Sequence, residues 1–192
     1  LAGLYKAQEK FEAAESLYKR DLEISEKELG PDHPDVATTL NNLGELYRTQ
    51  GKFEEAKPLH VRAIEIREKK FKPDHPDVAT ALNSLAVLYQ AQGKLEAAEP
   101  LYKRALTIRE KTLGPNHPNV ATSLNNLASL YESQEKYAAA EPLYMRALDI
   151  IESKLGTDHS TFRTLSGNYA GLLRHLGRED EAKEIMKRVG GG

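Results

Sequence analysis

One stretch of this chain recurs at a fixed interval of 42 residues. The segment 33–47 returns at 75–89 and 117–131 and, in diverged form, at 159–173. The first two full units share 25 identities over their 42 positions without a gap. A fixed period in this range is typical of stacked repeats, in which each unit packs only on its neighbours. We therefore predict one continuous repeat domain over residues 1–189.

The period also divides this domain into units. The first unit begins partway through a helix, so we expect another element to cover that end. The last unit has Ser160 where the others have proline and Gly167 where they have asparagine, and its strongly charged final helix suits the end of an array. The expected units are a partial repeat at 1–32, full repeats at 33–74, 75–116 and 117–158, a capping repeat at 159–189 and a flexible glycine tail at 190–192.

Each full unit reads as two helices. The first, helix A, starts near Pro34, because proline is tolerated in the first turn of a helix. Its apolar residues Val36, Leu40 and Leu43 recur at spacings of three and four, which is one face of a helix. Gly51 suits the left-handed conformation at a helix end.

Helix B is predicted over residues 53–71, followed by a prolyl turn at 72–74. Proline recurs inside this helix at positions 58, 100 and 142, where it removes one backbone hydrogen bond and should bend the helix. Small residues recur as regularly as large ones, and they allow neighbouring helices to approach closely. The pattern predicts an all-α protein, a right-handed superhelical solenoid of antiparallel helix pairs.

The small and large positions also match a known family. Leu43, Gly44, Tyr47, Ala56 and Ala63 have the spacing of the tetratricopeptide repeat. The 42-residue unit, with its Leu-Asn-Asn-Leu and Ile-Arg-Glu segments, resembles the repeat of kinesin light chains. This resemblance implies a module that binds an extended peptide segment of a partner protein in a concave groove.

Two columns of residues carry that implied function. By resemblance, Asn41, Asn83 and Asn125 face the groove and hold the backbone of the peptide, a task that suits an amide because it can donate and accept together. A bond to an adjacent helix is the structural alternative. Arg67 and Arg109 align with groove arginines that pair with acidic residues of the ligand, and an ordinary solvated arginine is the alternative there.

The neighbours of the asparagines one turn away on helix A should share the same surface. As a set they are mixed and without a dense lysine clamp. They are Thr38, Glu45 and Arg48; Thr80, Val87 and Gln90; and Thr122, Ser129 and Glu132.

Other recurring residues have structural interpretations. The histidines at 33, 75, 117 and 159 recur at the start of helix A, where they would cap it. Equivalent positions in stacked helix layers lie about 10 Å apart, too far for shared metal ligation. The arginines at 62, 104 and 146 should brace adjacent helices through carboxylates, and the tyrosines at 47, 89 and 131 should pack between helices. We expect no bound metal and no cofactor, and the isolated His60 and His175 suggest nothing by their spacing.

Composition excludes several classes of function. Lys and Arg number 27 against 29 Asp and Glu, which argues against a nucleic-acid-binding protein. There is no cysteine, so disulfides and thiol chemistry are excluded and a cytoplasmic location is compatible. The sequence has no apolar run long enough to cross a membrane and no visible secretory leader. Glycine-rich phosphate loops, paired carboxylates and catalytic triads do not appear, so we expect no enzyme.

The sequence therefore predicts a non-catalytic module that binds an extended, acidic and apolar segment of a partner protein. Two other classes stay open. One is a scaffold that self-associates end to end through its truncated first repeat. The other is the regulatory region of a larger signalling protein.

Overall fold

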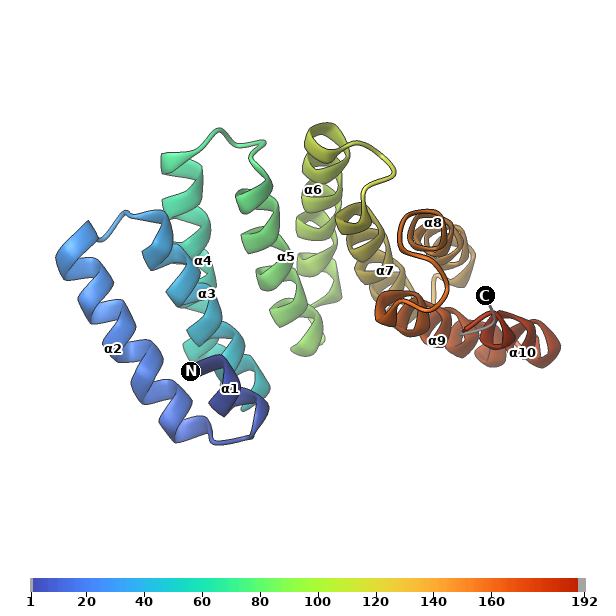
Figure 1. The fold of residues 1–192 in the computed structure, drawn as a ribbon, viewed down its shortest axis with the longest axis horizontal. Coiled ribbons are helices and arrows are strands. Elements are labelled where there is room, and N and C mark those ends of the chain that lie inside the picture. Colours follow the sequence, from blue (N-terminus) through green and yellow to red (C-terminus); the bar gives the residue numbers. More distant parts are fainter. Residues whose placement is uncertain (1, 190–192) are drawn as a thin grey trace. The chain divides into compact units, whose positions relative to one another are not determined.

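The computed structural model describes residues 2–189, which form helices α1 to α10 without a strand among them. The predicted glycine tail at 190–192 lies outside the described residues. The helices, drawn in Figure 1, are α1 (Ala2–Ala7), α2 (Phe11–Leu29), α3 (Pro34–Thr49), α4 (Phe53–Lys70), α5 (Pro76–Ala91), α6 (Leu95–Leu113), α7 (Pro118–Ser133), α8 (Tyr137–Leu155), α9 (Ser160–His175) and α10 (Glu179–Lys187).

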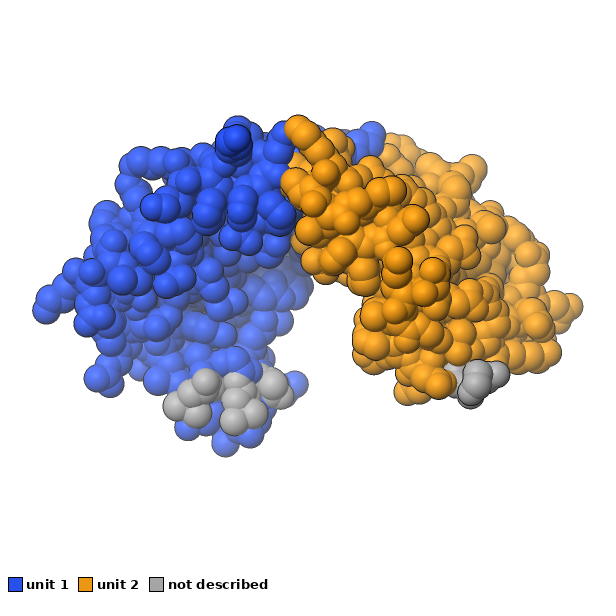
Figure 2. Space-filling view, turned by 45° about the horizontal axis from the view of Figure 1, so that its top comes forward, with its two compact units in different colours: residues 1–105 blue, residues 106–192 orange. Residues whose placement is uncertain are grey.

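The chain divides into two compact units, residues 1–105 and 106–192, coloured separately in Figure 2. The division falls within α6. In the first unit α3 packs on α4, and this pair is flanked by α2 and α5. In the second unit α7 packs on α8, and α9 follows with α10 against it. Helix A and helix B thus alternate within each unit as the period predicts.

The start of each helix A follows directly from the sequence. His33, His75, His117 and His159 are the N-cap residues, and each Nδ1 accepts a hydrogen bond from the backbone N–H two residues later, at 3.1 or 3.2 Å. Proline then occupies the first helical position of α3, α5 and α7, where its missing N–H leaves nothing unsatisfied. The capping role predicted for these histidines is confirmed.

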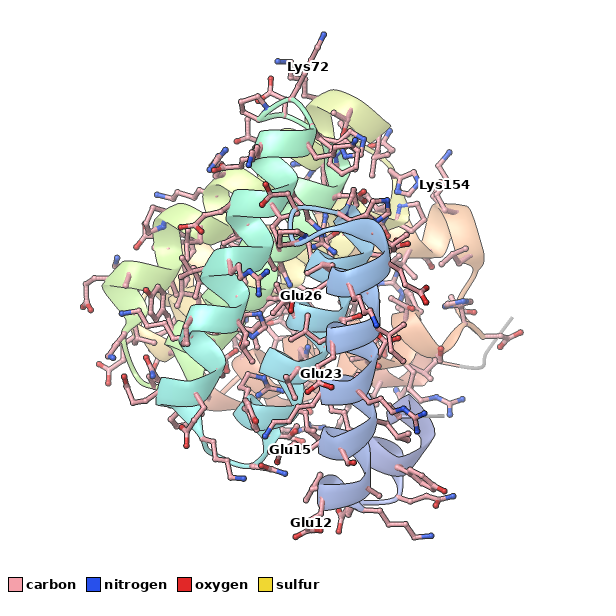
Figure 3. The ribbon with its side chains drawn as sticks, turned by 90° about the vertical axis from the view of Figure 1, so that its left-hand side faces the viewer. Glu12, Glu15, Glu23, Glu26, Lys72 and Lys154 are labelled. Carbon is pink, nitrogen blue, oxygen red and sulfur yellow. The ribbon has the colours of Figure 1, made fainter. Side chains whose placement is uncertain are left out.

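The ends of the helices show where the repeat varies. Gly51 has φ 73° after α3, the left-handed backbone expected there, but Glu135 adopts φ 60° at the matching turn after α7. Helix α4 ends at Lys70, one residue earlier than predicted. The ring of Phe71 stacks on His75 at 4.1 Å between centroids, and Phe71 is already extended. Lys72, which follows, projects from this loop in Figure 3.

The core consists of the small and apolar columns. Alanines at 56, 98, 140 and 182 are fully buried, and so are Val36, Val78 and Val120 at the start of each helix A. In the second unit one continuous cluster joins α7, α8, α9 and Ala182 of α10. Small side chains at the helix crossings allow close packing, while leucine and aromatic side chains fill the space between.

A column of arginines braces neighbouring B helices. Arg62 binds Glu26 at 2.6 Å, and Arg104 binds Glu68 at the same distance. In the second unit Arg146 binds Glu110 at 2.6 Å and Arg188 binds Glu152. The acceptor in every pair lies 36 residues before the arginine. We call these pairs the arginine clamps, and they confirm the bracing role predicted for the arginines at 62, 104 and 146.

Candidate functional site

The predicted binding residues lie on one side of each helix A. On α3 they occupy positions 38, 41, 45 and 48, and the same offsets recur on α5 and α7. Spacings of three and four place these residues in one stripe along a helix. All of them are half-buried or exposed, whereas the leucines between them are buried. We call this stripe the A-helix face.

Arg67 reaches this face from α4 and is almost completely buried, at 7 % exposure. Its guanidinium donates to the Thr38 hydroxyl and to the backbone carbonyl of Asp77, each at 3.3 Å. Both acceptors are uncharged, and the second belongs to α5. Arg67 therefore joins α4 to both flanking A helices without an ion pair.

Arg109 of α6 has the equivalent arrangement in the second unit, at 9 % exposure. It donates to the Ser123 hydroxyl at 2.7 Å and to the backbone carbonyl of Asn119 at 3.4 Å. The position equivalent to Ser123 in the preceding repeat is Ala81, so Arg67 lacks this short bond.

These two guanidiniums are unusual because no carboxylate of residues 2–189 forms a salt bridge with either of them. Burial lowers the pKa of Arg67 and of Arg109, and the more distant charge of Asp77 offsets only part of this effect at Arg67. A buried cation without a paired anion is costly, and the structure keeps two of them at equivalent positions.

The asparagine column takes part in bonds between helices. Asn41 Nδ2 donates to the Ser84 hydroxyl of α5 at 2.9 Å, and its Oδ1 lies 2.9 Å from Nδ1 of His60 on α4. In the second unit the direction is reversed, because Asn125 Oδ1 accepts from Asn168 Nδ2 of α9 at 2.8 Å. Both amides are half-buried. Asn41 and Asn125 thus brace adjacent helices as well as lying on the A-helix face.

The last two positions of the stripe on each helix A, such as Glu45 and Arg48 on α3, differ between repeats. Glu45 binds Arg48 through both oxygens, at 2.6 and 2.7 Å, and also pairs with Lys6 of α1 at 3.5 Å. Although burial raises it, the pKa of Glu45 is lowered on balance by these two cations. On α5, Val87 is half-buried and Gln90 accepts from the Tyr102 hydroxyl at 2.9 Å.

On α7 the matching positions are Ser129 and Glu132. The carboxylate of Glu132 accepts from the Tyr144 hydroxyl at 2.9 Å. The three threonines of the stripe are exposed, and each donates to a backbone carbonyl of its own helix four residues earlier: Thr38, Thr80 and Thr122. On α3 and on α7 the stripe therefore offers hydroxyl, amide and carboxylate groups.

Sequence reasoning missed His60. It occupies the column that holds Tyr18, Tyr102 and Tyr144 in the other repeats, and it is fully buried. Its ring lies against Gly44, where a Cβ atom would come within 2.8 Å of Nε2. The paired departure from tyrosine at 60 and from alanine at 44 was the signal in the sequence.

Among residues 2–189 no group of three or more His, Cys, Asp or Glu side chains is placed to hold a metal ion. No helix within that range has the length and apolar character needed to cross a membrane. Figure 3 shows Glu12, Glu15, Glu23 and Glu26 along α2, and two of them have internal partners, Glu26 in an arginine clamp and Glu15 with Tyr47.

The repeats match a family model. The model of the tetratricopeptide repeat matches residues 1–69, 50–111 and 77–153, which together cover most of the chain. The chain therefore belongs to the tetratricopeptide repeat family. No curated protein matches the sequence.

Solved structures narrow this similarity to repeat proteins of the kinesin light chain type. TPR-like repeats of a Podosopora anserina protein described as a kinesin light chain are 26% identical, with a TM-score of 0.79, over 100% of this chain and 90% of that one. A variant form of those repeats is 25% identical with a TM-score of 0.81 over the same shares. BtubC (BKLC) from P. vanneervenii is 28% identical with a TM-score of 0.82, over 98% of this chain and 75% of that one.

These matches confirm the all-α solenoid predicted from the period. They also support a protein-interaction module, since this fold is typically a non-catalytic scaffold.

Proposed function

We propose that the A-helix face binds an extended, acidic segment of a partner protein. The observation that carries this proposal is the pair of buried arginines, Arg67 and Arg109, whose partners within residues 2–189 are hydroxyl and carbonyl oxygens. A ligand carboxylate would supply the missing anion to each guanidinium. Arginine suits this role because its planar group binds a carboxylate through two hydrogen bonds.

The remaining groups of the face fit the rest of an extended ligand. The amides of Asn41 and Asn125 each have two N–H hydrogens and an oxygen with two lone pairs, so the one donor and one acceptor bond of each leave capacity for the ligand backbone. Val87 and the aliphatic parts of the neighbouring side chains offer apolar contact. We place this activity in the cytoplasm, which the cysteine-free composition permits.

Titration with an acidic peptide that contains an aromatic residue tests the proposal by calorimetry. Replacement of Arg67 by methionine removes the guanidinium and keeps an unbranched side chain. We therefore expect the affinity for the peptide to fall about 10-fold. We also expect unchanged or higher stability, by about 1 kcal/mol, because an unpaired buried charge is removed. Arg109→Met should behave similarly, with a smaller gain in stability because the Ser123 bond is lost.

Arg62→Met is the matched control. Arg62 lies on the same helix as Arg67 but already has Glu26 as its partner. It should lose a little stability and keep full affinity for the peptide. Equal affinity in the Arg67 and Arg62 variants, or a clear loss of stability in Arg67→Met, would mean that Arg67 is a structural residue and would overturn the proposal.

The first unit favours self-association as a second candidate. Ile24 of α2 is 45% exposed, and Leu29 at the end of the same helix is 48% exposed. The same unit has a cavity of about 500 Å³ lined by residues of α1, α2 and α3. Light scattering over a concentration series separates the candidates. A mass that rises with concentration, and returns to the monomer in Ile24→Lys, would favour assembly through this surface.

A further inference from the structure

His60 is buried in the first full repeat, and one of its two ring nitrogens lacks a hydrogen-bond partner among the described residues. The residue is 0% exposed, and Nε2 has no hydrogen-bond partner among the described residues. A buried nitrogen of this kind is uncommon in proteins and calls for a physical explanation. At the equivalent position of the next two repeats, the hydroxyl of Tyr102 donates a hydrogen bond to Gln90 and that of Tyr144 to Glu132.

The hydrogen bonds around His60 assign the hydrogen to one nitrogen of its ring. The Ser84 hydroxyl donates to the backbone carbonyl of Thr80 at 3.2 Å, so it accepts from Asn41 Nδ2. The Oδ1 atom of Asn41 therefore faces His60, and an amide oxygen can only accept. This network assigns the hydrogen to Nδ1 of His60 and leaves Nε2 as the bare acceptor.

A second proton on the imidazole would have to enter at Nε2. Gly44 lies directly against this atom, so the N–H bond would point at packed helix rather than at an acceptor. Burial lowers the pKa of His60 to about 4, which agrees with this geometry. The native repeat thus accommodates the neutral ring and excludes the charged one.

The charged groups near the ring do not stabilise its protonated form enough to offset burial. Two from α3 act on it, Glu45 in favour of the charged form and Arg48 against it. The carboxylate of Glu45 is already shared with Arg48 and with Lys6 of α1. On α5, Ser84 is neutral and is linked to the ring only through Asn41. On α6, burial raises the pKa of the Tyr102 phenol, so this side chain also stays neutral.

We propose that His60 makes the first full repeat acid-sensitive: uptake of one proton at Nε2 opens the contact between α3 and α4, and with it the part of the A-helix face that carries Asn41 and Arg67. The third repeat has tyrosine at this position and keeps its contact under the same conditions. This property is independent of which ligand the face binds.

The direction of the pH effect follows from the two protonation states. The unfolded or opened repeat binds a proton with the ordinary pKa of about 6.5, whereas the closed repeat resists it until about pH 4. The stability that neutral His60 contributes to the closed repeat is therefore present above about pH 6.5. It declines as the pH falls from about 6.5 to about 4. From pH 7 to pH 5 the opening equilibrium of α3 and α4 should rise roughly 20-fold.

Amide hydrogen exchange followed by mass spectrometry at pH 7 and pH 5 tests this, with rates normalised to the intrinsic exchange rate at each pH. Peptides from α7 and α8 are the internal control, because His117 caps α7 as His33 caps α3. The double variant Gly44→Ala/His60→Tyr copies the Ala128 and Tyr144 pair of that repeat. It should remove the extra acid sensitivity of α3 and α4.

Equal loss of protection in the two repeats, or an unchanged difference in the double variant, would overturn the proposal. Titration of the wild-type protein by NMR gives an answer even if that variant does not fold. The Cε1–H resonance of His60 should stay at its neutral position down to about pH 4. A midpoint near the ordinary value of about 6.5 in the folded protein would also overturn it.

Discussion

The first and third full repeats share their plan but differ in the polar residues behind the A-helix face. In both, a histidine caps helix A and an arginine clamp holds helix B. The first repeat fills the space between its two helices with His60 against Gly44, and the third with Tyr144 beside Ala128. The elements that fix the stacking are thus repeated closely, while the groups that surround the face vary.

The asparagines express the same contrast. Asn41 uses its oxygen for His60 and its nitrogen for the next helix A, whereas Asn125 uses its oxygen for the next helix A. The nitrogen of Asn125 donates to Asn126 at 3.4 Å, so both amides use one donor and one acceptor but bind different neighbours.

The largest test of this contrast is Gly44→Ala. The new methyl group would lie 2.8 Å from Nε2 of His60, and the bond of that ring to Asn41 prevents easy movement. We expect a loss of about 2–3 kcal/mol in the free energy of unfolding, measured by urea denaturation. The same change combined with His60→Tyr should cost much less, because alanine and tyrosine coexist in the third repeat. Equal costs in the two backgrounds would show that ring and glycine are not coupled.

The periodic part of this architecture could be predicted from the sequence. Helix starts at His33, His75 and His117, the turn at Gly51 and the clamp arginines depend on local spacing, which repeats in the chain. The early end of α4 was missed, although Lys72 stands where the other long B helices are followed by Gly30, Gly114 and Gly156, all with positive φ.

The site could be predicted only in outline. Resemblance placed Arg67 and Arg109 on the face, but their near-complete burial without a carboxylate depends on three helices that meet in space. His60 was overlooked because a single histidine has no periodicity. Its role depends on the pairing with Gly44 and Asn41, which no spacing along one helix reveals.

A smaller test concerns the turns between helices A and B. Glu135 holds a left-handed backbone at φ 60°, whereas Gly51 takes φ 73° at the matching turn of the first repeat. Left-handed backbone costs a residue with a side chain roughly 1–2 kcal/mol. Glu135→Gly should therefore stabilise the third repeat by about 1 kcal/mol after the loss of backbone entropy in glycine is included. Gly51→Glu should destabilise the first repeat by a similar amount, and opposite signs in the two denaturation midpoints check this.

The smallest expected effect belongs to the arginine clamps, the element in which the two repeats agree. Arg146 and Glu110 are 2.6 Å apart, but their side chains are 40% and 33% exposed. Solvent-exposed ion pairs contribute about 0–1 kcal/mol, and salt screens them. We expect Arg146→Met and Arg62→Met to lose about 0.5 kcal/mol each, and about 1 M salt to remove most of that difference from the wild type. A loss of stability above about 2 kcal/mol that persists in high salt would exceed the range of such ion pairs. It would mean that the hydrogen bonds from these arginines to the Pro31 and Pro115 carbonyls organise the loops between repeats. In that case the clamps, and not only the buried apolar columns, would hold the stack together.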